Sequence, residues 1–243
     1  MIREIKKKFI ILGNRMPFTP EIKSYFRQIE EKEWLYNNMK LEGTGLTRGQ
    51  IETMAMGDVY LNVPIGDHVM ADKISMLLEK LWFFESMKRS LDLSVVDEIH
   101  REISGDKNYK NYRKRNLVIQ ELGYTPPMPA AIPERMDSLA RVFIEALDAE
   151  PVSEEVFEYM AAIHNKTAEI FPYGENDRLI ARVTATYYMM IKGFPAVMLD
   201  MKEQEYNDMI GAYLKTGDLT ECKEAFKRVI FNRLDLMIQL TPY

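Results

Sequence analysis

Residues 151–194 read PVSEEVFEYMAAIHNKTAEIFPYGENDRLIARVTATYYMMIKGF and carry the clearest structural pattern in the chain. It predicts two helices joined by a short charged loop. The first helix follows Pro151 and Ser153, has two glutamates in its first turn, and carries one stripe of Val156, Met160, Ile163 and Thr167. The second carries Ile180, Val183, Tyr187 and Ile191, and the glycine at 193 should end it.

The loop between these helices is the best candidate for a functional site. It holds Phe171, Pro172, Tyr173, Gly174, Glu175, Asn176, Asp177 and Arg178, and Arg182 follows one turn later. A loop that brings a carboxylate and two arginines to the start of a helix is a place where chemistry could occur. The alternative interpretation is a polar turn whose arginines are solvated on the next helix.

The rest of the chain is mostly helical in pattern. Thr19 and Pro20 form an N-cap and a first-turn proline, and Thr47 with Gln50 forms a capping box. Apolar periodicity and end signals predict further helices over about residues 20–42, 47–55, 67–84, 94–104, 133–147, 202–214 and 220–239.

Residues 107–129 break this helical pattern. Leu117, Val118 and Ile119 are strand-like, and Gly123-Tyr124 leads into a cluster of three prolines that a helix cannot hold. We therefore expect a short β-hairpin flap here. The predicted fold is all-α with this one β element, in a single domain over residues 1–243.

Composition excludes several classes of protein. With 47% hydrophobic and 28% charged residues the chain is an ordinary globular sequence, and a net charge of -5 argues against a nucleic-acid binder. Its single cysteine, Cys222, cannot form an internal disulfide, which favours a reducing compartment. The apolar run near the N-terminus is too short for a signal or membrane segment, so we expect a cytoplasmic protein with no membrane partner.

Standard catalytic signatures are missing from the sequence. It has no P-loop, no Cys/His cluster with metal-ligand spacing and no G-x-S-x-G, and its three histidines, His68, His100 and His164, are far apart. His164 lies on the apolar side of its helix, where a packed, hydrogen-bonded histidine is the expected role.

Several segments together resemble the Fic (Fido) family, whose motif reads H-P-F-x-[D/E]-G-N-G-R-x-x-R on a helix-loop-helix. WLYNNMKLEGTGLT at 34–47 is similar to the family's stretch ending in I-E-G-N-x-L-T, and NYRKRNLVIQELGYTPP at 111–127 is similar to its flap. The segments GFP at 193–195 and GDLT at 217–220 follow in the family's order. The resemblance covers about residues 34–231 and implies a Fic-like helical bundle with a core over about 67–231.

The resemblance implies AMP transfer from ATP to hydroxyl side chains of target proteins, with Mg²⁺. In the family the histidine is the base, the acidic residue holds Mg²⁺, and the G-N-G backbone and the arginines hold the phosphates. A length-preserving overlay places Phe171 at the histidine, Glu175 at the metal carboxylate, Asn176, Asp177 and Arg178 at G-N-G, and Arg182 at the second arginine. A slip of one residue sets Arg178 on the first arginine instead, and neither overlay supplies a histidine.

Two further roles follow from the same resemblance. The N-terminal helices at 20–45 contain N-M-K-L-E-G, similar to an inhibitory pattern, so Glu42 would pair with Arg182 and deny it to the γ-phosphate. This pair could equally be a purely structural contact between helices. In the flap, Ile119 and Tyr124 would hold an extended segment of a protein target by strand addition.

The leading hypothesis is a Fic-fold protein whose AMP transfer is absent or strongly impaired. A positioned general base contributes on the order of 10²–10⁴ in rate, and phenylalanine cannot accept a proton. The alternatives are a non-catalytic module that binds a protein or ligand with its flap and cleft, and a weakly active nucleotidyl or phosphoryl transferase in which Glu175 or a substrate group acts as base. By resemblance, the partner is a protein target and the chain could form a homodimer.

Overall fold

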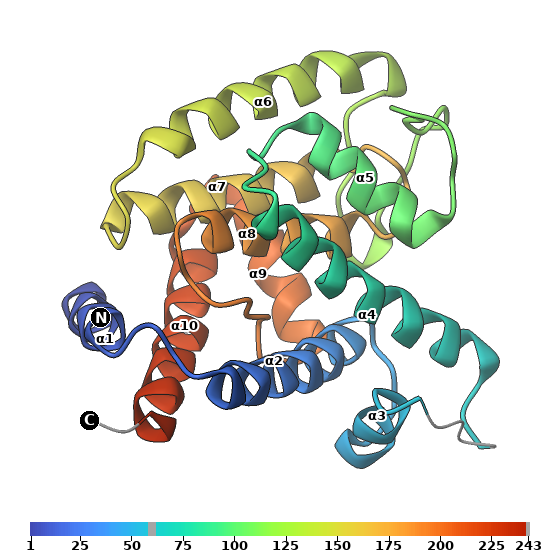
Figure 1. Cartoon of the computed structure of the whole chain (residues 1–243). Helices are drawn as coiled ribbons and strands as arrows, with labels where there is room; N and C mark the ends of the chain where they lie inside the picture. The colour runs from blue at the N-terminus through green and yellow to red at the C-terminus, as the bar shows by residue number, and fades with distance from the viewer. Residues whose placement is uncertain (58–61, 242–243) are drawn as a thin grey trace.

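A computed structural model describes residues 1–57 and 62–241. These residues form ten α-helices and two short 3-10 helices (Figure 1). In chain order they are α1 (Ile2–Asn14), α2 (Pro20–Leu41), α3 (Arg48–Met54), α4 (Ile65–Ser86), α5 (Leu93–Ser104), η1 (Gln120–Leu122), η2 (Pro129–Ala131), α6 (Ile132–Asp148), α7 (Glu154–Ile170), α8 (Asp177–Ile191), α9 (Glu203–Thr216) and α10 (Thr220–Leu240). The all-α prediction is confirmed.

Helix α8 is the centre of the structure. Thirteen of its fifteen residues are buried, so it has neighbours on every side. Its partners include α7, α4 and α5, and α7 in turn packs against α6 and α10 (Figure 1). The predicted helix-loop-helix is thus the frame on which the other helices are placed.

Local end signals operate as the sequence predicts. The Thr19 side chain accepts a hydrogen bond from the Ile22 N–H at the start of α2, and Thr47 and Gln50 form a reciprocal capping box at α3. At the other end of α8, Gly193 has φ +86°, a left-handed conformation that glycine adopts without the steric cost of a side chain. These signals fix where α2 and α3 begin and where α8 ends.

The predicted β-hairpin flap is wrong. In the described part of the chain, the segment holds one isolated antiparallel bridge, Ile119–Tyr124, closed around η1, and no strand. The three prolines after it cannot donate to a ladder. The residues before it are held by the Arg113 side chain rather than by a partner strand.

Helix α1 was not expected from the sequence. It buries Ile5 and Leu12 and packs along α10, so the two ends of the chain lie side by side (Figure 1). In the described residues, no helix is long and apolar enough to cross a membrane.

Candidate functional site

Phe171 leaves α7 in a left-handed backbone conformation, with φ 46° and ψ 60°. This conformation is uncommon for a non-glycine residue, so the surroundings must hold it in place. The ring is 5% exposed and belongs to the hydrophobic core. The residue at the predicted base position therefore turns an apolar ring into the protein interior.

Arg113, from the segment before η1, fixes this turn. Its Nε donates to the Phe171 carbonyl at 2.7 Å, and its backbone N–H donates to the Pro172 carbonyl at 2.9 Å. Its guanidinium also donates to the carbonyls of Arg115 and Pro127. One buried side chain thus joins the loop to both ends of the 113–127 segment, a role that its sequence context did not suggest.

Asp177 is buried and faces the backbone of its own loop. Its carboxylate accepts the N–H of Tyr173 at 3.0 Å and of Gly174 at 2.6 Å. Burial raises the pKa of Asp177 to about 7, while these two N–H groups and the nearby Arg113 act to lower it. The chain thereby supplies its own anion to two amides of the loop.

Gly174 is required by this arrangement. It has φ +91°, and a Cβ built on it would lie 3.5 Å from the Arg113 side chain. Asn176 also keeps a left-handed conformation, with φ 59°. Asparagine tolerates positive φ better than most residues with a side chain.

Helix α8 starts at Asp177 without a side-chain cap on its first amides. Glu175 is exposed and makes no hydrogen bond or ion pair with the described residues. Among the described residues, no group of three or more His, Cys, Asp or Glu side chains could hold a metal ion. Glu175 and Asp177 face different surroundings, one toward solvent and the other toward the loop backbone.

Arg182 is fully buried and pairs with Glu42, the residue that caps the C-terminal end of α2. Its Nε also lies 3.4 Å from the Asn38 side-chain oxygen, and its guanidinium stacks 4.9 Å from the Tyr206 ring centre. Burial acts to lower the pKa of Arg182, but Tyr206 and Glu42 outweigh it and the pKa is raised. The ion pair implied by the resemblance is present in the structure.

Arg178 lies one turn before Arg182 in α8. Its Nη1 donates to Asn207 Oδ1 at 2.6 Å, and its Nη2 lies 3.4 Å from the Glu121 carboxylate in η1. Its position at the start of α8 places it beside the loop, but both ends of its guanidinium already have partners within the protein.

The two predicted flap residues lie close to this loop. Ile119 and Tyr124 form the bridge, and the Tyr124 hydroxyl donates to the Glu169 carbonyl near the end of α7 at 3.1 Å. The structure therefore gathers the predicted site residues around the α7–α8 turn, with Arg182 and Glu42 one helical turn deeper.

One histidine is packed as the sequence predicts, and a second makes a contact that the sequence did not predict. His164 is fully buried, its ring nitrogens lie 2.8 Å from Asn165 and Tyr206, and burial lowers its pKa to about 4, as expected for a packed histidine. His100 stacks on Tyr173 with ring centres 3.7 Å apart and planes 4° from parallel. No sequence signal joined His100 to the loop, because the contact crosses from α5.

Residues 90–189 match the Fic/DOC family model, a region that runs from the start of α5 to the end of α8 and includes the loop. This part of the chain is a Fic/DOC family domain. The match contains the 113–127 segment, Phe171 and both arginines of α8. Glu42 lies outside it.

Solved structures show the same fold over nearly the whole chain. A Fic domain-containing signaling protein from Bacteroides thetaiotaomicron is 21% identical with a TM-score of 0.81, covering 98% of this chain and 97% of that one. Fic-1 from C. elegans is 18% identical, with a TM-score of 0.74 over 98% of this chain and 71% of that one. A Fic family protein from Desulfovibrio desulfuricans is 14% identical, with a TM-score of 0.61, covering 99% and 72%. No curated protein matches the chain.

Proposed function

We propose that this Fic-fold protein has lost efficient AMP transfer, or retains it only at a strongly reduced rate. The observation that carries the proposal is Phe171. At the position where the family uses a histidine base, this chain has a buried apolar ring that cannot take a proton from a hydroxyl. Loss of a positioned base alone costs on the order of 10²–10⁴ in rate.

The electrostatics of the loop support the same proposal. The Asp177 carboxylate lies on the amides of Tyr173 and Gly174, so in its ionised form it adds negative charge beside the place where phosphates would bind. Positive charge at a helix N-terminus favours phosphate binding, and negative charge disfavours it.

Both arginines that would hold phosphates have other partners. Arg182 is paired with Glu42 and buried, and Arg178 is hydrogen-bonded to Asn207. Releasing Arg182 by removing Glu42 would restore one cation but not the base. An inhibitory contact is therefore not the main obstacle to catalysis.

The test uses labelled ATP, Mg²⁺ and a lysate of host proteins, with the wild-type chain and with Glu42→Gly. We expect no label above background from either protein, on any target or on the chain itself. Robust labelling by either one would overturn the proposal and favour a transferase that uses a different base, for which Glu175→Ala is the first variant to measure.

A second proposed function, binding of a protein target, rests on the segment between Arg113 and Pro127. Val118 is 69% exposed in a segment held rigidly by Arg113 and by the Tyr124 hydroxyl. A fixed, exposed apolar backbone segment loses little entropy when an extended partner binds. Pull-down with the wild-type chain and with Ile119→Asp tests it, and capture that is insensitive to this substitution would count against it.

Nucleotide binding separates the two functions. Because α8 begins without a side-chain cap, its first amides still offer a place for an anion. In a thermal-shift titration, ATP and Mg²⁺ must raise the melting temperature of a nucleotide-binding protein by mass action. The melting temperature of a module that binds only a protein target should not change.

A further inference from the structure

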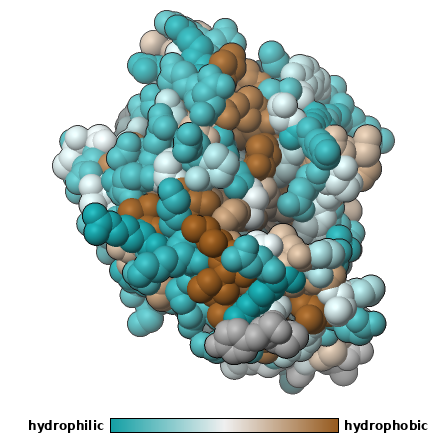
Figure 2. Space-filling model, turned by 60° about the vertical axis from the view of Figure 1, so that its left-hand side comes forward, coloured by the Kyte–Doolittle hydropathy of each residue, from teal (hydrophilic) through white to brown (hydrophobic). Residues whose placement is uncertain are grey.

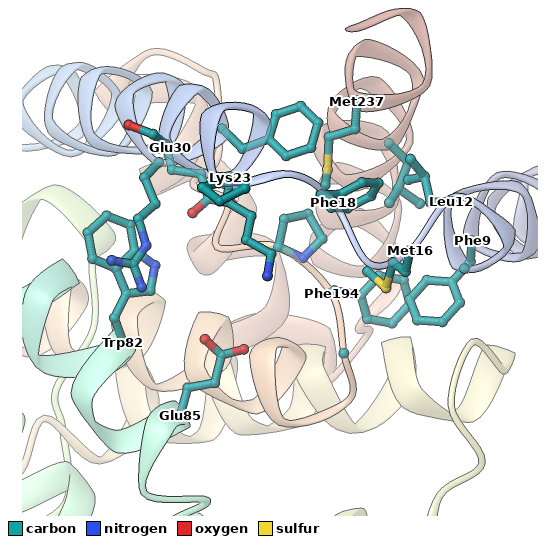
Figure 3. Close-up of a pocket in the computed structure, with 18 residues that line it drawn as sticks. Phe9, Leu12, Met16, Phe18, Lys23, Glu30, Trp82, Glu85, Phe194 and Met237 are labelled. Atoms are coloured by element: carbon teal, nitrogen blue, oxygen red, sulfur yellow. The ribbon is translucent and has the colours of Figure 1, made fainter. Parts of the chain in front are cut away.

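A cavity of about 790 Å³ lies away from the Fic loop, at the other end of α8 (Figure 3). It is enclosed by α1, α2, α4, α10 and the segment after α8, where Gly193, Phe194 and Pro195 line it. The fifteen residues of α8, at about 1.5 Å each, separate it from the loop by roughly 20 Å. This cavity is therefore distinct from the site described above, and its size is that of a small-molecule pocket.

One end of the cavity is apolar. Phe9, Leu12, Met16, Phe194 and Met237 line it, and the rings of Phe9 and Phe194 lie 5.2 Å apart (Figure 3). These side chains come from both ends of the chain and from the segment after α8. On the face turned forward in Figure 2, which includes the α1 side of the molecule, hydrophobic side chains gather in a band between hydrophilic surfaces. An aromatic or aliphatic group would bury apolar surface here.

The other end of the cavity is lined by two glutamates. Glu30 is 9% exposed, its nearest recorded cation is Arg233 at 3.9 Å, and Glu85 lines the same space (Figure 3). Burial raises the pKa of Glu30 to about 7; Arg233 lowers it and Glu85 raises it further. Burial also raises the pKa of Glu85. Arg27 lowers the pKa of both glutamates, yet both pKa values stay raised, so both carboxylates would gain from a further cation.

Two cations also line the cavity but are placed differently. The Arg27 guanidinium stacks on the Trp82 ring at 4.9 Å, and both Lys23 and Arg27 are exposed to solvent. A hydrated surface cation attracts an anion weakly, whereas a desolvated carboxylate interacts strongly with a cation. The buried Glu30 therefore decides which charge the cavity favours.

We propose that this cavity binds an amphipathic amine, with its apolar body among Phe9, Leu12 and Phe194 and its protonated amine between Glu30 and Glu85. The indole of Trp82 forms the wall beside the amine. A carboxylate of the same shape would place negative charge against both glutamates.

The test uses three probes with one body and different heads: 4-phenylbutylamine, 4-phenylbutanol and 5-phenylpentanoate. Binding is followed by tryptophan fluorescence, because Trp82 lines the cavity whereas Trp34 is buried in the core and donates to the Ile74 carbonyl. A thermal shift provides the second measurement. We expect the amine to bind about tenfold more tightly than the alcohol, and the carboxylate to bind most weakly.

Variants separate the charge from the shape of the cavity. Glu30→Gln combined with Glu85→Gln should reduce the affinity for the amine to that for the alcohol. Gly13→Phe should weaken all three probes, because Gly13 lines the cavity in α1 and a Cβ there meets no atom within 4 Å. Gln28→Ala, on exposed α2 surface outside the lining, is the matched control and should change nothing.

Three results would overturn the proposal. They are the absence of binding by any probe at millimolar concentration, tighter binding of the carboxylate than of the amine, and unchanged binding in a folded Gly13→Phe variant. The melting temperature of each variant establishes whether it is folded before its affinity is compared.

Discussion

Replacing Glu42 by alanine should destabilise the protein through Arg182. The Arg182 guanidinium is fully buried, and Glu42 is the one carboxylate paired with it in the described structure. Its remaining contacts are a 3.4 Å hydrogen bond to Asn38 and the face of Tyr206, and its Nη1 has no hydrogen-bond partner. Without Glu42, the positive charge would stay in the core with neutral partners only.

The magnitude follows from this geometry. Removing one partner of a buried ion pair costs about 3–5 kcal/mol, because the other charge is left uncompensated. The Glu42 side chain is 19% exposed, so water can reach part of the vacated space and reduce this cost. We therefore expect a loss of roughly 2–4 kcal/mol in the free energy of unfolding. In a chain of this size, each kcal/mol lowers the melting temperature by about 2–4 °C.

Urea and thermal unfolding followed by circular dichroism measure this loss. The matched control is Asp200→Ala, which removes the exposed partner of Lys40 on the same helix as Glu42 and should cost less than about 1 kcal/mol. The double variant Glu42→Ala/Arg182→Met should be more stable than the sum of the single effects predicts, because it removes the unpaired charge. A Glu42→Ala protein as stable as the control, or an additive double variant, would refute the reasoning.

Three further predictions concern the loop and the core. Because the folded-state pKa of Asp177 is raised to about 7 from 3.8, its contribution is most stabilising below pH 3.8 and is lost as pH rises through 7. The free energy of unfolding should therefore fall between pH 3.8 and about 7, by up to about 1.4 kcal/mol per pH unit. Asp177→Asn should remove this pH dependence in urea unfolding, and an unchanged pH dependence would contradict the prediction. Arg113→Ala should speed proteolysis within residues 113–127 while the α7–α8 core stays protected, because the Arg113 side chain donates to the carbonyls of Phe171, Arg115 and Pro127. Equal cleavage of the wild-type and variant proteins would show that other contacts hold the segment. Cys222 is buried and burial raises its thiol pKa, so it should react with a thiol reagent at pH 8 only after denaturant is added.

Helices were predicted well where apolar spacing and end signals agreed. The α7–α8 pair carries both, and its loop begins and ends close to where the sequence places it. Helix α1 was not predicted, although Ile2, Ile5, Phe9 and Leu12 have helical spacing. This spacing of apolar residues indicates an amphipathic helix, whatever the length of the apolar run.

The flap failed for a physical reason. A run such as Leu117–Ile119 satisfies strand propensity, but strand formation depends on a partner for the ladder. In this chain the neighbouring carbonyls are taken by the Arg113 guanidinium, and only Ile119 and Tyr124 exchange backbone bonds. The same guanidinium also donates to the Phe171 carbonyl, 58 positions away, and sequence spacing could not reveal that contact.

Asp177 shows the same limit within the site. The resemblance places Glu175 at the metal carboxylate and Asp177 in the phosphate-binding segment, two residues apart. The structure points Glu175 to solvent and Asp177 to the amides of Tyr173 and Gly174. The direction of a side chain at a loop-helix junction depends on which donors the backbone presents, and this follows from the left-handed turns at Gly174 and Asn176.

These contacts also explain how the frame can persist without catalysis. Three sets of groups that a nucleotide could approach already have partners in the chain: the loop amides bind Asp177, Arg182 binds Glu42, and Arg178 binds Asn207. The folded loop therefore needs no phosphate or metal to satisfy its charges. Selection for stability alone would keep Arg182 and Glu42 together, because losing either leaves the other charge unpaired, and it would not select for histidine at 171. The retained ion pair is thus evidence for the fold, and Phe171 is the residue that bears on catalysis.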